Sequence, residues 1–343
     1  MTTIKFAGII FFSLMSIGYC QGQDPAFSQY FSSPLNINPA LTANVNGDWR
    51  VIANCRDQWI GPASPYTTGT ISYDTKILKS KVAETNYVGL GGMLMFDQAM
   101  ARILKTSYAS INVSYNIKLA EGEDGGEHRM GMGAGLTYAH SQVDYDRLNF
   151  SRQFTGFGFD TNLPTGEAAL TNMKPYLSAN LGLLYSYIST YSNIDLGIAG
   201  YHLNKPKQTF TEDPKQRLPA RYVVHGSFST YIGEKIILNA NGIYQTQSGT
   251  NYFSIGGAVG YYLSDIADKE QDEVILNAGL WYWSNNAVIP YLGLAYQNFQ
   301  FGLTYDINIS KLSQAAGKPK TFELSFIIRS KEKIKDVIPC FWK

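Results

Sequence analysis

The chain has 343 residues, of which 28 are basic and 27 acidic, and its mean hydropathy is −0.15. These values exclude a polytopic helical membrane protein, which needs several runs of about 20 apolar residues. They also argue against nucleic-acid binding, which requires a concentrated basic face. Because 14% of the residues are aromatic, a disordered chain is not expected either. A β protein rich in glycine and tyrosine remains.

Residues 1–22 are typical of an export signal. Lys5 supplies the positive charge, an apolar stretch covers residues 6–17, and small residues between positions 18 and 22 favour cleavage there. The apolar stretch is shorter than the ~20 residues that a membrane anchor needs. A lipoprotein cut before Cys20 is disfavoured because Tyr19 stands where a small residue is wanted. We therefore expect an exported mature chain.

From residue 47 onward the dominant pattern is alternation. In residues 110–119 every odd position is apolar and every even position is polar. Successive side chains of a strand point to opposite faces, so this pattern predicts strands between an apolar and a polar environment. About 14 such segments are expected, each near the length that a tilted membrane strand needs. They cover residues 47–57, 66–75, 86–97, 105–119, 128–144, 175–188, 192–203, 219–232, 235–246, 251–263, 273–283, 287–297, 299–307 and 320–330.

A soluble sandwich and a membrane barrel both contain alternating strands. The polar face here is mainly Gly, Ser and Asn, which suits a crowded lumen better than a water-exposed sheet. Tyrosines end several apolar rows, as an aromatic girdle requires, although tyrosine is also common in strands generally. A sheet in lipid must close on itself. The expected fold is all-β, a transmembrane antiparallel β-barrel of about 14 strands.

The connections divide the mature chain. If the chain starts in the periplasm, the three longest connections (146–174, 204–218 and 308–319) fall on the outer side, as in outer-membrane barrels. We expect a periplasmic N-terminal segment over residues 23–46, a barrel over 47–330 and a periplasmic tail over 331–343. The N-terminal segment should be extended or turn-like because of its prolines. It either packs in the lumen or forms a flexible lead-in.

Several motifs in the mature chain carry a family resemblance. Residues 24–30 read DPAFSQY, residues 36–40 read NINPA, residues 56–59 read RDQW, and residues 304–312 read TYDINISKL. With these motifs the chain resembles the PorP/SprF family of type IX secretion system outer-membrane proteins. The ending at residues 339–343, PCFWK, keeps only the cysteine of that family's closing motif.

The resemblance implies an outer-membrane barrel of Bacteroidetes with no known enzymatic activity. It implies export or surface anchoring of type IX cargo such as gliding adhesins, through the cargo C-terminal domain. Other secretion or gliding components and outer-membrane lipid are the further implied partners. The rival interpretations are a diffusion porin or hydrophobic-solute transporter, and a purely structural barrel that ties the machinery to the cell envelope.

Candidate lumen or packing residues come from the N-terminal segment and the first two strands. Phe27 and Tyr30 are apolar anchors of the segment, and Trp59 belongs to the RDQW motif. Alternation places Arg50 and Arg56 on the inward face of the first strand, where buried arginines need carboxylate partners. Candidate partners on other inward rows are Asp74, Asp97, Asp306 and Glu323. A salt network that fixes the barrel is one interpretation, and a cargo contact is the other.

The longest outer connection contains four phenylalanines among Gly, Ser and Thr, namely Phe150, Phe154, Phe157 and Phe159. An aromatic-rich exposed loop commonly marks a binding surface, so these residues are candidates for cargo binding. The alternative is a loop that folds into the lumen as a constriction.

Catalysis, cofactors and metals have little support in the sequence. None of the four histidines lies in a known catalytic or metal-binding spacing. The glycine-rich runs lack the following helix that a phosphate-binding loop needs. The exported chain keeps Cys55 and Cys340, which have neither metal nor redox spacing. No enzyme activity and no cofactor are expected.

Overall fold

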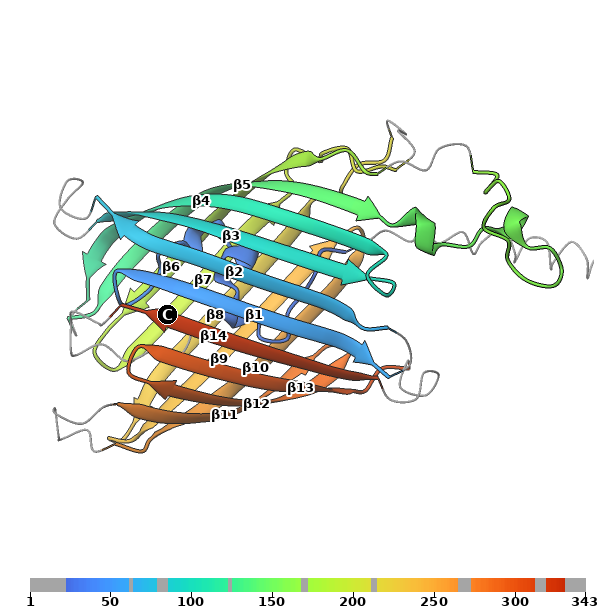
Figure 1. Ribbon diagram of the computed structural model, residues 1–343. Coiled ribbons are helices and arrows are strands. Elements are labelled where there is room, and N and C mark those ends of the chain that lie inside the picture. Colours follow the sequence, from blue (N-terminus) through green and yellow to red (C-terminus); the bar gives the residue numbers. More distant parts are fainter. Residues whose placement is uncertain are drawn as a thin grey trace, which may run out of the picture.

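The computed structural model describes residues 23–61, 64–78, 86–122, 125–167, 172–210, 215–264, 273–311 and 319–330. The expected signal peptide (1–22) and C-terminal tail (331–343) lie outside these ranges. Fourteen strands pair antiparallel with their sequence neighbours, and β1 pairs with β14 to close the barrel (Figure 1). The predicted fold class is thereby confirmed. No helix within the described ranges has the length and apolarity to cross a membrane.

The fourteen strands match the fourteen predicted segments one to one, and no end differs by more than three residues. The strands are β1 (Trp49–Ile60), β2 (Tyr66–Ile77), β3 (Tyr87–Ala99), β4 (Leu104–Glu121), β5 (Glu127–Val143), β6 (Tyr176–Ile188), β7 (Ser192–Tyr201), β8 (Arg221–Ile232), β9 (Ile236–Gln247), β10 (Thr250–Tyr262), β11 (Val274–Trp283), β12 (Ala287–Tyr296), β13 (Phe299–Asn308) and β14 (Lys320–Arg329).

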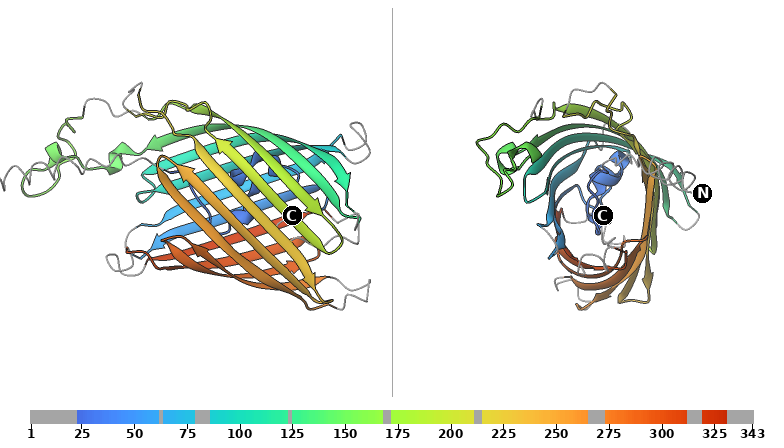
Figure 2. Two further views of the ribbon diagram at one scale, coloured as in Figure 1. Left: turned by 180° about the vertical axis from the view of Figure 1, so that it is seen from behind. Right: turned by 90° about the vertical axis from the view of Figure 1, so that its right-hand side faces the viewer.

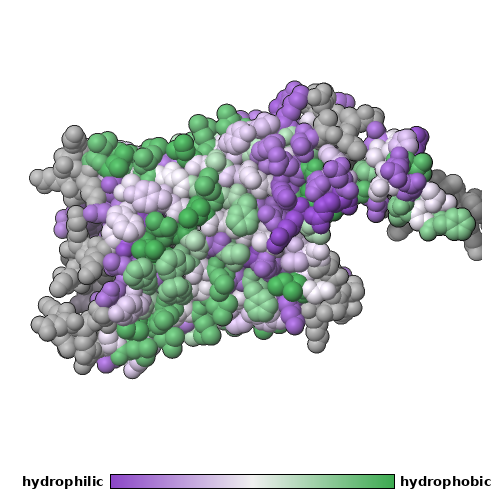
Figure 3. Space-filling model, viewed as in Figure 1, coloured by the Kyte–Doolittle hydropathy of each residue, from purple (hydrophilic) through white to green (hydrophobic). Residues whose placement is uncertain are grey.

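The two faces of the barrel differ as the alternation predicts. On β4 the inward Asn112 and Ser114 are buried, whereas the outward Ile111 is 66% exposed. Apolar residues of this outward kind cover much of the wall in Figure 3. Outward tyrosines lie near both ends of the strands, for example Tyr282 at the end of β11 and Tyr296 at the end of β12. An apolar wall with aromatic residues at both ends is typical of membrane-spanning barrels.

The two ends of the barrel carry different connections. The two longest connections, 144–175 and 202–220, lie at one end together with 309–319. The other end has the short turns at 189–191, 233–235 and 297–298 and the moderately long connections at 78–86 and 263–273. We call these the outer end and the periplasmic end, because the longer loops of outer-membrane barrels are extracellular. Odd-numbered strands therefore run toward the outer end.

Residues 24–45, here called the lumenal segment, run inside the barrel (Figure 2, right). The segment contains the short helices η1 (Tyr30–Ser32), α2 (Pro34–Ile37) and η2 (Pro39–Leu41). Before these single helical turns the segment has no regular secondary structure, in keeping with the expected extended or turn-like backbone. The prolines begin α2 and η2, where a missing N–H costs nothing, and the Asn38 side chain accepts a hydrogen bond from the Ala40 N–H.

The lumenal segment begins at the outer end, although we expected a periplasmic segment. The Asp24 N–H donates to Gln247, the last residue of β9, at the outer end (3.0 Å). The Val45 carbonyl accepts from Lys76, near the periplasmic end of β2 (2.5 Å). The segment therefore runs through the lumen from the outer end toward the periplasmic end, and β1 then runs back.

Candidate functional site: the lumenal segment and the outer rim

A buried charge cluster holds the first part of the lumenal segment. The Ser28 hydroxyl donates to Asp306 (2.7 Å), and the N–H groups of Ser28 and Gln29 donate to the Glu323 carboxylate (2.7 and 3.0 Å). The Arg56 guanidinium lies 3.1 Å from Asp306 and 3.8 Å from Glu323. All these side chains are buried. One arginine thus faces two carboxylates from β13 and β14, and the segment supplies further donors.

A second ion pair holds the last part of the segment. Arg50 and Asp74 form two contacts, Nη2 to Oδ2 at 2.6 Å and Nε to Oδ1 at 3.1 Å. The same carboxylate accepts a hydrogen bond from the Ala43 N–H (2.9 Å). A paired guanidinium and carboxylate are tolerated in a buried site when hydrogen bonds satisfy the remaining oxygens.

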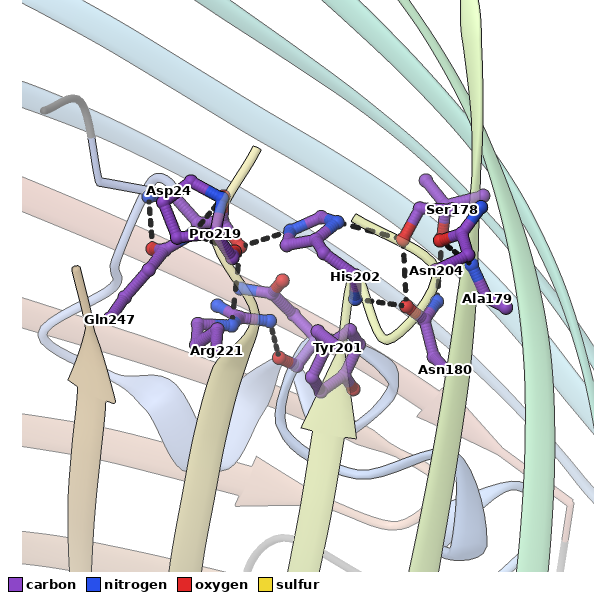
Figure 4. A network of polar contacts seen from close by, with 12 residues as sticks. Asp24, Ser178, Ala179, Asn180, Tyr201, His202, Asn204, Pro219, Arg221 and Gln247 are labelled. Atoms are coloured by element: carbon purple, nitrogen blue, oxygen red, sulfur yellow. Dashed lines mark hydrogen bonds and ion pairs between the residues drawn. The ribbon is translucent and has the colours of Figure 1, made fainter. Parts of the chain in front are cut away.

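A third polar cluster lies at the outer end (Figure 4). The Asp24 carboxylate lies 2.7 Å from His202 Nε2 and 3.2 Å from Arg221 Nε. His202 Nδ1 is 2.7 Å from the Ser178 hydroxyl on β6. Burial raises the pKa of Asp24, but Arg221 and His202 outweigh burial and hold that pKa below its ordinary value. The start of the segment is therefore fixed as a carboxylate.

Side chains of the barrel wall also donate hydrogen bonds to the main-chain carbonyls of this irregular segment. A buried carbonyl without a hydrogen bond is costly, so a segment without regular structure needs such donors. The wall donors and their carbonyl acceptors are Asn54 to Ser32 (2.6 Å), Ser114 to Thr42 (2.7 Å), Tyr201 to Leu35 (2.9 Å), Arg221 to Asn36 (2.9 Å) and Arg56 to Ala26.

Apolar contacts also pack the segment against the barrel wall. The Phe31 ring packs 4.9 Å from Trp281 and 5.7 Å from Tyr291. Phe27 and Tyr30 are buried as well. Beside these rings, a cavity of about 50 Å³ extends toward β8 and β9, which is room for a few water molecules only.

Glycines on the wall make room for the segment. A Cβ on Gly133 of β5 would overlap the main chain of Pro39 and Ala40, and a Cβ on Gly182 of β6 would overlap the Asn38 side chain. The alternating glycines of β5 thus permit close approach of another backbone.

The structure brings five of the six candidate lumen residues against the lumenal segment or into it: Phe27, Tyr30, Arg50, Arg56 and Asp74. Trp59 lies apart from them. It is half-buried near the outer end of β1, follows a register shift and packs edge-on against Tyr66 (5.4 Å). Sequence reasoning missed His202 and Arg221, because only the fold brings these strand-end residues to Asp24.

The four loop phenylalanines lie on the described part of the outer connection, 144–167, which projects from the barrel (Figure 1). Phe154 and Phe159 pack together (5.2 Å) and remain about half exposed, Phe157 is fully exposed, and Phe150 is partly buried. Gln153 is buried beneath them and donates to the Leu163 carbonyl (3.0 Å). The described portion of the loop therefore presents aromatic rings to the outside.

Within the described residues, no group of three or more His, Cys, Asp or Glu side chains could hold a metal ion. Cys55 is a free cysteine on the exposed outward wall. Cys340 lies outside the described ranges.

Comparison with solved structures finds channels and transporters of low sequence identity. The TodX monoaromatic hydrocarbon channel (a deletion mutant) is 10% identical, with a TM-score of 0.45 over 86% of this chain and 93% of that chain. The CymD monoaromatic hydrocarbon channel is 8% identical, with a TM-score of 0.43 over 90% and 95%. The Ralstonia pickettii toluene transporter TbuX is 9% identical, with a TM-score of 0.40 over 85% and 92%. No curated protein sequence matches the chain.

A family model gives a more specific result. The model described as "Type IX secretion system membrane protein PorP/SprF" matches residues 19–328, which is nearly the whole chain. The match confirms the resemblance carried by the motifs and, with the barrel fold, places the protein in the outer membrane. The chain belongs to the PorP/SprF family of type IX secretion system membrane proteins.

Proposed function

We propose that this membrane component of the type IX secretion system assists the export or surface anchoring of cargo proteins such as gliding adhesins. It does so by binding the cargo C-terminal domain at the outer rim. The observation that carries the proposal is the aromatic loop, in which Phe154, Phe157 and Phe159 are exposed beyond the barrel. Exposed aromatic clusters of this kind are typical of protein-binding surfaces.

The occupied lumen supports this proposal over a diffusion porin or a hydrophobic-solute transporter. A transporter needs an open or gated passage, whereas three polar clusters tie the lumenal segment to the wall here. We propose no catalytic role. The other proposed partners are further secretion or gliding components and the lipid of the outer membrane.

The test is binding of a cargo C-terminal domain to the purified full-length barrel in detergent. The variant F154S/F157S/F159S should bind at least tenfold more weakly, because loss of a few buried aromatic anchors costs more than about 1.4 kcal/mol. The matched control is Ile309→Ser, which removes an apolar side chain of similar exposure from another outer loop. Undiminished binding by the triple variant, or equal loss in the control, would count against this surface.

A further inference from the structure

The outward face of β3 to β5 changes from apolar to polar before these strands reach the outer end. On β4, the outward side chains from Ala109 to Leu119 are apolar or aromatic, whereas those of Lys105 and Ser107 are polar. Figure 3 shows hydrophilic residues gathered over the outer end of these strands, beside the apolar wall. The residues of this surface, here called the outer band, are Gln98, Arg102, Lys105, Ser107, His140 and Gln142.

The outer band lies at the height of the lipid headgroups. Tyr138 of β5 pairs in register with Ala109 and forms the outward row directly below the band. Outward tyrosines of membrane barrels lie at the boundary between hydrocarbon and water. On the opposite side of the barrel, the outermost outward residues of β11, β12 and β13 are Tyr282, Val288 and Ile307. The polar surface is therefore a local feature of β3 to β5.

Two cations of the outer band have no partner in the protein. Arg102 lies in the turn between β3 and β4, Lys105 lies on β4, and both are exposed. Neither side chain forms a salt bridge or hydrogen bond with any residue of the described ranges. Of the neighbouring acids, Asp97 points into the lumen and Asp144 is half-buried beyond the end of β5. The band thus offers two positive charges to a ligand outside the barrel.

The turn that carries Arg102 is strained. Met100, Ala101 and Arg102 have φ values of 53°, 58° and 66°, and the Ile103 N–H donates to the Met100 carbonyl (3.1 Å). Glycine or asparagine is favoured in this left-handed conformation, because a Cβ crowds the following carbonyl oxygen. Strain of this kind is characteristic of functional positions. An arginine where a less costly residue would fit the backbone indicates a role for its guanidinium.

These features fit the phosphate of a lipid headgroup. Guanidinium and ammonium groups are the side chains with which proteins bind phosphate, and basic clusters beside a membrane attract anionic headgroups. Gln98 and Gln142 pair in register with Lys105 from either side and add amide donors. Directly below, Phe96 and Leu94 are 44% and 59% exposed. An apolar surface at the edge of the cationic site suits a ligand that carries acyl chains.

We propose that the outer band binds the phosphate-bearing headgroup of a glycolipid in the outer leaflet of the membrane. Arg102 and Lys105 pair with the phosphate, the neighbouring amides donate to the headgroup, and an acyl chain lies along Phe96 and Leu94. The bound lipid fixes the height of the barrel in the membrane on the side from which the aromatic loop, residues 144–167, projects. The inference is independent of the proposed cargo role.

Native mass spectrometry of the purified full-length protein in detergent tests this site, with diphosphoryl lipid A as the probe. The variant R102N/K105Q removes both charges. Asparagine suits the left-handed backbone at position 102, so the turn should form at least as well as in the parent. The matched control is K205N/K207Q, which removes two exposed lysines from another outer connection, where Lys205 also has a positive φ of 43°.

We expect R102N/K105Q to bind diphosphoryl lipid A at least about tenfold more weakly than the parent, and the control to bind it like the parent. Removal of the phosphates from the lipid should weaken its binding to the parent to a similar extent. Equal binding by the parent and R102N/K105Q, an equal loss in the control, or undiminished binding of the dephosphorylated lipid would overturn the proposal. So would displacement of the lipid by millimolar inorganic phosphate, which would reveal a site for a free anion.

Discussion

Replacing Asp74 by alanine is expected to lower the free energy of unfolding by about 4–6 kcal/mol. The carboxylate contacts Arg50 twice, at 2.6 and 3.1 Å, and accepts from the Ala43 N–H. Both side chains of the ion pair are at most 4% exposed, so the variant leaves a buried guanidinium without its carboxylate. Breaking such a pair costs about 3–5 kcal/mol, and the lost hydrogen bond adds about 1.

Urea unfolding of the barrel refolded in lipid vesicles measures this change. The double variant R50M/D74L should recover most of the loss, because apolar residues can replace a buried pair at little cost. Asp97→Ala is the control: the described contacts of Asp97 are one hydrogen bond from Thr68 and no ion pair, so we expect a loss of about 1 kcal/mol. If D74A and D97A lower the free energy of unfolding equally, or if the double variant is no more stable than D74A, the Arg50–Asp74 pair does not have the strength assigned to it here.

Three further predictions concern the lumenal segment. Deletion of residues 24–40 should raise the single-channel conductance in a planar bilayer, and an unchanged conductance would show that the segment does not limit passage. Gly133→Ala should displace the segment and raise its protease sensitivity because the new Cβ would overlap Ala40, whereas Gly92→Ala, with its nearest neighbour at 3.6 Å, should not. The pKa of Asp24 is lowered in the fold. The Asp24 carboxylate therefore stabilises the docked lumenal segment fully above the unfolded pKa of about 3.9, and this stabilisation is lost as the pH falls below that value. Protection of the segment from protease should therefore be constant near neutrality and weaken only in acid. The variant Asp24→Asn should show the weaker protection already at pH 7. If acid weakens protection as strongly in the variant as in the parent, Asp24 is not the group responsible.

The barrel itself was predictable because lipid and lumen impose opposite demands on alternate residues. In residues 110–119 this demand is met at every position, so the period alone fixes β4 and its two faces. The same parity placed Arg50 and Arg56 in the lumen. It also limited their carboxylate partners to a few inward acids, of which Asp74, Asp306 and Glu323 are in contact with them.

The path of the lumenal segment was not predictable by the same means. Its direction depends on Asp24 meeting His202 and Arg221, which are far away in sequence and stand in no recognisable spacing. Prolines restrict the local backbone of the segment but do not say which end of the barrel it enters. The direction of the Trp59 side chain was not predictable either, because a register shift after Asp57 interrupts the alternation of inward and outward residues.

Affinity purification decides whether this family member serves type IX cargo at the outer rim. The tagged full-length protein is isolated in mild detergent from its native cell, and the co-purifying proteins are identified by mass spectrometry. We expect reproducible recovery of a large surface protein or of type IX components, and less of them with the F154S/F157S/F159S variant. A barrel that is recovered alone and conducts ions in a bilayer without any deletion would speak against cargo binding and favour a porin.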